Sequence, residues 1–177
     1  MPDSSTVVVH PVLVSTSGNQ SYIFASNRLR EAVGASYLLA RSTTAWVEEA
    51  LSGTGSKLVQ ASSGSTLAVA PDRDAARALA RAVTGKALRE APGLAIHAVS
   101  VEIDGEAPTA DEVGAVFAEY QRHVAARPSV AARHQRLPVV AACDSTDLPA
   151  RSWHADVDAE LHGEPDADLR PRRCPPR

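Results

Sequence analysis

The chain has few aromatic side chains and no long apolar run, and these shortages limit what it can be. Aromatic residues make up 4% of the 177 residues, so a core has to come mainly from the aliphatic part of a 44% apolar sequence. No stretch approaches the ~18 consecutive apolar residues of a membrane-spanning helix. The N-terminus also lacks the basic and apolar regions of a signal peptide. The sequence therefore predicts a cytoplasmic protein that does not contact a membrane.

Lysine and cysteine are also scarce. Only two of the 18 basic residues are lysines, and the net charge of −3 argues against broad electrostatic coating of nucleic acid, although a local basic patch stays possible. The two cysteines, Cys143 and Cys174, are too few to define a disulfide framework. A zinc site that combines them with His154 and His162 is disfavoured, because zinc motifs normally contain closely spaced ligand pairs.

Apolar periodicity predicts strands and helices in the order β-α-β-β-α-β, followed by one more helix. This order is the split βαβ, ferredoxin-like arrangement, an α/β (α+β) fold. Pro11 is expected to break the first strand or to place it at a sheet edge. The predicted elements are a strand at 7–14, a polar turn at 15–20, a short strand-like run at 22–24, a helix capped by Ser26 or Asn27 and ending near 51, strands at 57–61 and 66–70, a helix from Asp72 to the stop at 91–93, a strand at 94–103, and a helix opened by a capping box at 109–112.

Helical spacing predicts which side chains face the core. The expected buried stripes are Leu29, Val33, Tyr37, Ala40, Thr44, Val47 and Leu51 on the first helix, Ala75, Leu79, Val83 and Leu88 on the second, and Val113, Val116, Phe117, Tyr120 and Val124 on the third. We expect residues 7–127 to form one domain and 128–150 a connecting segment. Residues 151–177, which are rich in proline and charge and lack apolar periodicity, are predicted to be a disordered tail.

A ferredoxin-like fold with a tight central hairpin is also the palm of nucleotidyl cyclases and polymerases, and a palm needs carboxylates at two places. Two Mg²⁺ ions are held by an aspartate near the end of the first strand and by acids at the hairpin tip. Here these positions are Ser-Thr-Ser at 15–17 and Ser-Gly-Ser at 63–65. Neither offers a carboxylate, so a palm with this sequence cannot hold a metal pair by the usual route.

Two polar segments are candidate binding sites. The start of the first helix, with Asn27, Arg28, Arg30 and Glu31, suits contact with a nucleotide or a partner domain, but it equally suits a capped and solvated first turn. The hairpin at 62–66 could donate hydroxyl and amide groups to a phosphate, or could be an ordinary turn.

Small residues follow the helix start. Gly34-Ala35-Ser36 would allow another backbone to approach closely, although a glycine can also simply be tolerated inside a helix.

The stretch TSGNQSYIFASNRLREAVGAS resembles the signature of the large, polymerase-like subunit of type III CRISPR effector complexes and of its stand-alone relatives. The segments QASSGSTLAVAPDRDAARALARAVT and RLPVVAACDSTDLPA are similar to later parts of the same family, so the resemblance covers roughly residues 11 to 150. The matching positions of the signature are Gly18, Gln20, 22–24, 26–31 and 34–36.

This resemblance implies a function. Complete family members carry two palms, and the second, with a Gly-Gly-Asp-Asp hairpin, condenses ATP with Mg²⁺ into cyclic oligoadenylate. The first palm is degenerate and forms a nucleotide pocket shared with the second. The chain resembles the first palm, which implies a non-catalytic domain of a CRISPR-associated antiviral defence protein that binds no cofactor alone. Its implied partners are a nucleotide and a catalytic palm or CRISPR effector subunits, with RNA contacted only indirectly.

On this reading the residues expected to bind a nucleotide or partner are Asn27, Arg28, Arg30, Glu31, Gly34, Ser36, Ser63, Gly64 and Ser65. The sequence departs from the family after Ala150, as a truncated or frameshifted reading frame would. Two alternatives stay open: a stand-alone cyclase-like enzyme with unusual ligands such as Asp104 or Asp144, and an RNA-binding ferredoxin-like module. The latter needs exposed aromatic residues on the sheet, and the predicted strands offer almost none.

Overall fold

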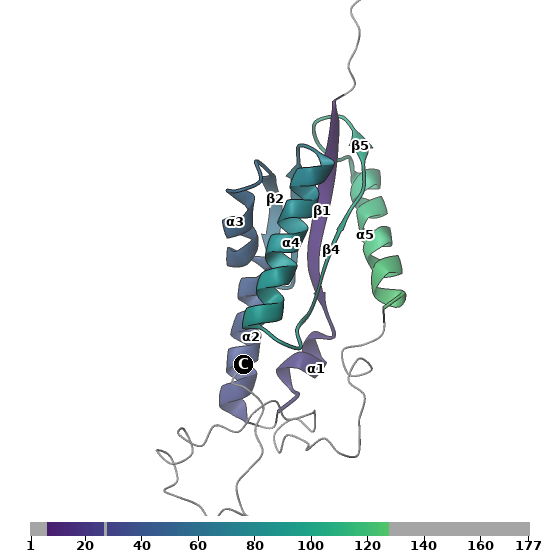
Figure 1. The fold of residues 1–177 in the computed structure, drawn as a ribbon. Coiled ribbons are helices and arrows are strands. Elements are labelled where there is room, and N and C mark those ends of the chain that lie inside the picture. The colour runs from purple at the N-terminus through teal and green to yellow at the C-terminus, as the bar shows by residue number, and fades with distance from the viewer. Residues whose placement is uncertain (1–6, 27, 128–177) are drawn as a thin grey trace, which may run out of the picture.

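A computed structural model describes residues 7–26 and 28–127, where a five-stranded antiparallel sheet packs against helices (Figure 1). The fold is the predicted mixed α/β, ferredoxin-like arrangement with one further helix. The elements are β1 (Val8–Ser17), α1 (Asn19–Ile23), α2 (Leu29–Thr43), α3 (Ala45–Leu51), β2 (Lys57–Ser62), β3 (Ser65–Ala70), α4 (Arg73–Glu90), β4 (Ala95–Ser100), β5 (Ile103–Asp104) and α5 (Ala110–Ala125).

The strand order is β2-β3-β1-β4, and β5 pairs with the start of β1. Every pairing is antiparallel, which follows from the two split βαβ units whose strands interleave. No helix within the described residues is long and apolar enough to cross a bilayer.

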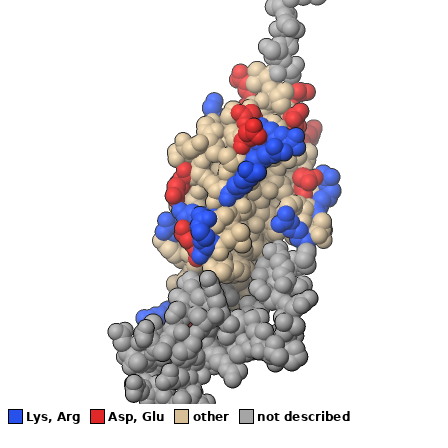
Figure 2. All heavy atoms as spheres, in the orientation of Figure 1, with Lys and Arg blue, Asp and Glu red and all other residues tan. Residues whose placement is uncertain are grey.

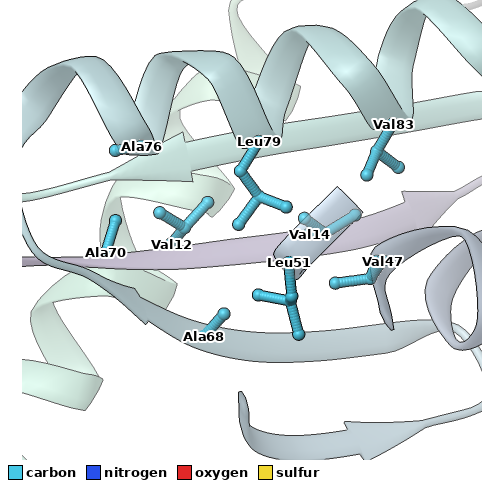
Figure 3. Close-up of a cluster of buried hydrophobic side chains, with 9 residues drawn as sticks. All are labelled: Val12, Val14, Val47, Leu51, Ala68, Ala70, Ala76, Leu79 and Val83. Carbon is cyan, nitrogen blue, oxygen red and sulfur yellow. The ribbon is translucent and has the colours of Figure 1, made fainter. Parts of the chain in front are cut away.

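Both faces of the sheet are covered by helices, because alternate residues of β1 point to opposite sides. Val12 and Val14 pack with residues of α3 and α4, as Figure 3 shows around Leu79. Leu13 lies on the other face and packs with Val116 and Tyr120 of α5. The predicted third helix therefore closes the second face of the sheet.

Pro11 lies inside a central strand, so the expectation that it breaks β1 or places it at an edge is wrong. Its position explains why it is tolerated. Pairing of β1 with β5 ends at Val9, and pairing with β4 begins at Val12. Pro11 lies opposite Val101 in the gap between these two pairings, and its carbonyl accepts from the amide of Val101 at 3.4 Å. Because proline has no amide hydrogen, it cannot donate back to Val101, so the pairing is interrupted there while β1 itself continues. The predicted strand at 94–103 accordingly divides into β4 and β5.

The segment between β1 and α2 also differs from expectation. Strand β1 continues to Ser17 and helix α1 begins at Asn19, so the predicted turn at 15–20 is half strand and ends in helix. The strand-like run predicted at 22–24 falls at the end of α1, with Phe24 as its C-cap. Gly18 has a φ of 63° and joins the two elements. The predicted helix ending near 51 is two helices, because the chain bends at Thr44, where φ is −118° and ψ is −90°.

The buried stripe predicted for α2 is wrong over its first half. Leu29, Val33 and Tyr37 are exposed, whereas Ala35 and Leu39 are buried. The physical reason is tertiary: α1 supplies Tyr22 and α3 supplies Trp46, and both pack on the Ala35 side of the helix. On α4 and α5 the predicted stripes are confirmed for the central residues and wrong for Leu88 and Phe117, which are exposed.

The cap predicted at Ser26 or Asn27 is wrong, because the N-cap of α2 is Arg28 and no side chain caps the helix there. The other local signals are confirmed. The hairpin turns at 63–64, and Asp72 caps α4 by accepting from the amide of Ala75 at 2.8 Å. Thr109 and Glu112 form the predicted capping box of α5. The segments predicted at 128–150 and 151–177, with all four residues considered for zinc and with Asp144, lie outside the described residues.

Candidate functional site

A cluster of hydroxyl groups joins the end of β1 to the tip of the hairpin, at the place where a palm would hold its metals. Three donors converge on the carbonyl oxygen of Gly64: the amide of Thr16 at 3.0 Å, Oγ of Ser15 at 3.0 Å and Oγ1 of Thr16 at 3.3 Å. The hairpin tip is thereby tied to the neighbouring central strand by hydrogen bonds beyond the β ladder.

The end of α2 completes this hydroxyl cluster from the other side. Thr43, which is fully buried, accepts from the amide of Gly64 at 2.8 Å and lies 3.2 Å from the carbonyl of Ser62. The hydroxyl of Thr66 donates to the carbonyl of Thr43. The members of the hydroxyl cluster are Ser15, Thr16, Thr43, Ser62, Gly64 and Thr66.

These bonds limit what the hairpin tip can bind. Both backbone polar groups of Gly64 already have partners inside the protein, so its amide is not available to a phosphate unless Thr43 gives way. Gly64 has a φ of 95°, a conformation that favours glycine over every other residue. Among the predicted tip residues, Ser63 is exposed and Ser65 is partly buried. The tip therefore contributes shape and side-chain hydroxyls rather than backbone donors.

Histidine and tyrosine side chains adjoin the hydroxyl cluster on the α5 side of the sheet. Oγ of Ser17 lies 2.9 Å from Nε2 of the buried His97, and the hydroxyl of Tyr120 donates to the carbonyl of Thr16 at 3.0 Å. His123 meets the ring of His97 edge-on, with centroids 5.5 Å apart.

Burial lowers the pKa of His123, helped by the nearby positive charge of Arg127 and opposed by Glu119. A lowered pKa favours the neutral imidazole. His123 therefore adds a polar side chain beside His97 that prefers its neutral form.

The donor set does not fit a two-metal site. Within residues 7–26 and 28–127, no three histidine, cysteine, aspartate or glutamate side chains lie together as a possible metal site. Asp104, the ligand considered for a stand-alone enzyme, pairs with Val8 at the start of β1. At about 3.4 Å per residue, Val8 and Ser15 are roughly 24 Å apart along the strand. The carboxylate of Asp104 thus lies at the opposite end of β1 from the hairpin tip.

The predicted residues at the helix start lie away from the hydroxyl cluster. Arg28 and Glu31 form an exposed ion pair at 3.9 Å, and Arg30 is exposed beside them. A rise of about 1.5 Å per residue separates Glu31 from Thr43 by roughly 18 Å along α2. The structure therefore does not bring the two predicted groups, helix start and hairpin tip, into direct contact.

The other predicted residues of this segment have mixed environments. Ser26 accepts from the amide of Arg28 at 3.2 Å, and Asn27 lies outside the described residues. Gly34 is partly buried and Ser36 is exposed, while Ala35 between them packs into the core. Only Ala35 of the three small residues is used for close packing with α1 and α3.

Sequence reasoning missed Thr43. The residue was assigned to a long amphipathic helix, in which a threonine carries little information. A signal was nevertheless present, because Ser42-Thr43-Thr44 is a run of three hydroxyl residues inside an apolar pattern. Such residues bond to nearby backbone and favour helix ends over helix interiors.

Fold and site together define a ferredoxin-like α+β domain in which a closed hydroxyl cluster joins the end of β1 to the hairpin tip. No protein-family model and no curated protein gave a match to the chain.

Proposed function

We propose that the chain is a non-catalytic palm domain of a CRISPR-polymerase-like antiviral defence protein, and that it contributes to an ATP pocket shared with a catalytic palm. The observation that carries the proposal is the hydroxyl cluster. Its residues stand where a catalytic palm has metal-binding carboxylates, and they are hydrogen-bonded to one another instead. The magnesium pair of a complete family member would therefore belong to the partner palm.

In this proposal the start of α2 supplies the contacts to the nucleotide or the partner. Arg28 and Arg30 are exposed, and a guanidinium group matches phosphate and carboxylate oxygens with paired donors. Glu31 pairs with Arg28 and holds it near the helix N-terminus, which itself favours anionic groups. Ser63 and Ser65 offer hydroxyl groups on the hairpin side.

Neither alternative gains support from the fold. An enzyme that uses Asp104 would have its carboxylate at the opposite end of β1 from the hairpin tip. An RNA-binding module of this fold stacks bases on a free sheet face. Here α5 covers that face, and its strands contribute Leu13, Leu67 and Val99 rather than aromatic residues.

The distribution of charge agrees with a local contact. Figure 2 shows basic and acidic side chains intermingled over the face in view, rather than one uniformly basic surface. Broad attraction to a nucleic acid backbone needs a continuous positive surface. Binding of a single nucleotide by two arginine side chains needs no such continuous surface.

The test is ATP binding by calorimetry, with and without a separately expressed catalytic palm from the same genome. We expect the chain alone to turn over no ATP with Mg²⁺ or Mn²⁺. We expect the pair of proteins to bind ATP, and the double variant R28A/R30A to weaken binding at least tenfold. The matched control is R77A/R81A on α4, which also removes one exposed partner of an i,i+3 ion pair and should leave binding unchanged.

Two results would overturn the proposal. One is oligoadenylate formation by the chain alone that survives substitution of Ser63 and Gly64. The other is an equal loss of binding in R28A/R30A and in the α4 control.

A further inference from the structure

Three large apolar side chains form an exposed row on α2. Leu29, Val33 and Tyr37 follow one another at intervals of four residues, which places them on one side of the helix. Their exposed fractions are 79%, 62% and 59%. We call these three residues the outer stripe. Single exposed apolar residues are normal on a protein surface, but a continuous row marks a contact surface.

The outer stripe is separate from the face by which α2 packs on the domain. Ala35 and Leu39 are buried on the opposite side, against Tyr22 and Trp46. A helix that is apolar on two sides is expected where it lies between two packed layers. Within the described residues only one of those layers is present over the first half of α2.

We infer that residues 137–142 of this chain, Leu-Pro-Val-Val-Ala-Ala, are the second layer and dock on the outer stripe. Six consecutive apolar residues in a polar neighbourhood are the complement that the outer stripe needs. As part of the same chain, the segment also acts at a high effective concentration.

The chain that leads to this segment starts at the end of the molecule where α2 begins. Figure 1 shows that the end of α5, helix α1 and the start of α2 lie at the same end of the molecule. Ten residues from Arg127 to Leu137 can span at most about 33 Å. The outer stripe is about 12 Å long at a helical rise, and six extended residues cover about 20 Å.

Charge sets the direction in which the segment lies. Arg28 and Arg30 flank Leu29 at one end of the outer stripe. Asp144 and Asp147 follow the apolar segment within five residues. Two opposite-charge pairs can form when Ala142 lies near Leu29 and Leu137 near Tyr37. This direction also brings Arg136 toward Arg41, which lies over the Tyr37 ring, so one like-charge contact opposes the two attractive ones. This direction places Cys143 beside the start of α2.

Disulfide cross-linking in the full chain tests the contact. The variant R30C/C174S leaves Cys143 and one new cysteine in the exposed first turn of α2. The matched control is Q20C/C174S, whose new cysteine is exposed on α1 at the same end of the molecule. We expect the α2 variant to form an intramolecular disulfide at least tenfold faster than the α1 control, measured by mass spectrometry under mild oxidation.

A second pair of variants separates docking from chance encounter. Adding V139D/V140D to the α2 variant should slow its cross-linking to the rate of the α1 control. Adding A131D/A132D, which places the same charges before the apolar segment, should leave the rate unchanged. Equal rates in the α1 and α2 variants would overturn the inference. Disulfides formed mainly between two chains would also overturn it, and would assign the outer stripe to a second copy.

Docking in this direction brings Asp144 and Asp147 to Arg28 and Arg30, which the proposed nucleotide contact also uses, so a nucleotide would have to displace these carboxylates. The cross-linking needs neither ATP nor a catalytic palm, so either proposal can fail while the other stands.

Discussion

The hydroxyl cluster and the outer stripe differ in how far their side chains are already satisfied within the domain. A polar cluster is expected to be open to a ligand and an apolar row to be buried, and here the reverse holds. The cluster is rich in hydrogen-bonding groups, yet Gly64 already has partners for both its amide and its carbonyl. The stripe has almost no hydrogen-bonding capacity, apart from Tyr37, whose hydroxyl accepts from Arg41 at 3.2 Å. Among the residues that the structure describes, Gly64 has its partners within the domain, whereas Leu29, Val33 and Tyr37 stay largely exposed.

Burial explains this difference. Thr43 and Thr66 are almost fully buried, and a buried hydroxyl without a partner costs about 1–3 kcal/mol. Polar groups at such a place have to satisfy one another. Leu29 and Val33 are under no such constraint, because exposed apolar side chains lower solubility without destabilising the fold. Saturated polar groups therefore indicate structure, while an uncovered apolar row indicates a contact.

The largest expected effect tests the contrast between buried and exposed leucine. Leu79 is fully buried between α4 and the sheet (Figure 3), and Leu79→Ala should lower the free energy of unfolding by about 2–5 kcal/mol. Leu29→Ala removes the same atoms from the outer stripe and should cost less than about 1 kcal/mol. Urea denaturation of both variants measures the difference. Equal losses would mean that Leu29 is as buried as Leu79.

A smaller effect tests whether the hydroxyl cluster is structural. Thr43→Val keeps the shape of the side chain and leaves the amide of Gly64 without its acceptor, so it should cost about 1–3 kcal/mol. The control is Thr84→Val on α4, where the hydroxyl donates only to Ala80 of its own helix. We expect the control to change the free energy of unfolding by less than about 0.5 kcal/mol. If the two variants unfold at the same urea concentration, Gly64 is not held by Thr43.

The smallest effect concerns the histidine beside the cluster. The folded chain holds the pKa of His123 below its ordinary value of 6.5, mainly through burial. Between the lowered and the ordinary pKa the unfolded chain binds the proton more readily, so protonation favours unfolding. Stability should be complete above pH 6.5 and decline below it.

In His123→Gln the loss of stability below pH 6.5 that comes from this histidine should disappear. Thermal unfolding of both proteins between pH 5 and 7 measures the difference. An unchanged pH profile in the variant would show that the environment of His123 does not disfavour its charge.

Local signals predicted the parts of the fold that are decided by a few neighbouring residues. The capping box of Thr109 and Glu112 and the cap at Asp72 were read from four residues each, because their hydrogen bonds close within one turn. The hairpin was predicted in the same way from Ser-Ser-Gly-Ser between two β-like runs.

The site was predicted only in part. The lack of carboxylates at 15–17 and 63–65 is a property of the sequence, and the β1–β3 register does bring Ser15 opposite Ser65. The sequence assigned Arg28, Arg30 and Glu31 to the same site as the hairpin tip. In the structure these residues lie at the far end of α2 from the tip, and sequence alone does not give that separation. Thr43 is the last residue of α2, and it joins the site through hydrogen bonds to Ser62 and Gly64, which lie in a hairpin far along the chain.

The sequence by itself determined the order of the predicted strands, the caps at Asp72 and Thr109, the hairpin and the lack of carboxylates at 15–17 and 63–65, since each depends on residue identity or on neighbours within a few positions. The tertiary structure decided the rest. It selected which of two apolar sides of α2 is buried, because Tyr22 and Trp46 pack on the Ala35 side. It also kept Pro11 inside a central strand, where pairing with β3 continues although pairing with β4 and β5 is interrupted. Both decisions depend on contacts between residues far apart in the chain, which periodicity does not encode.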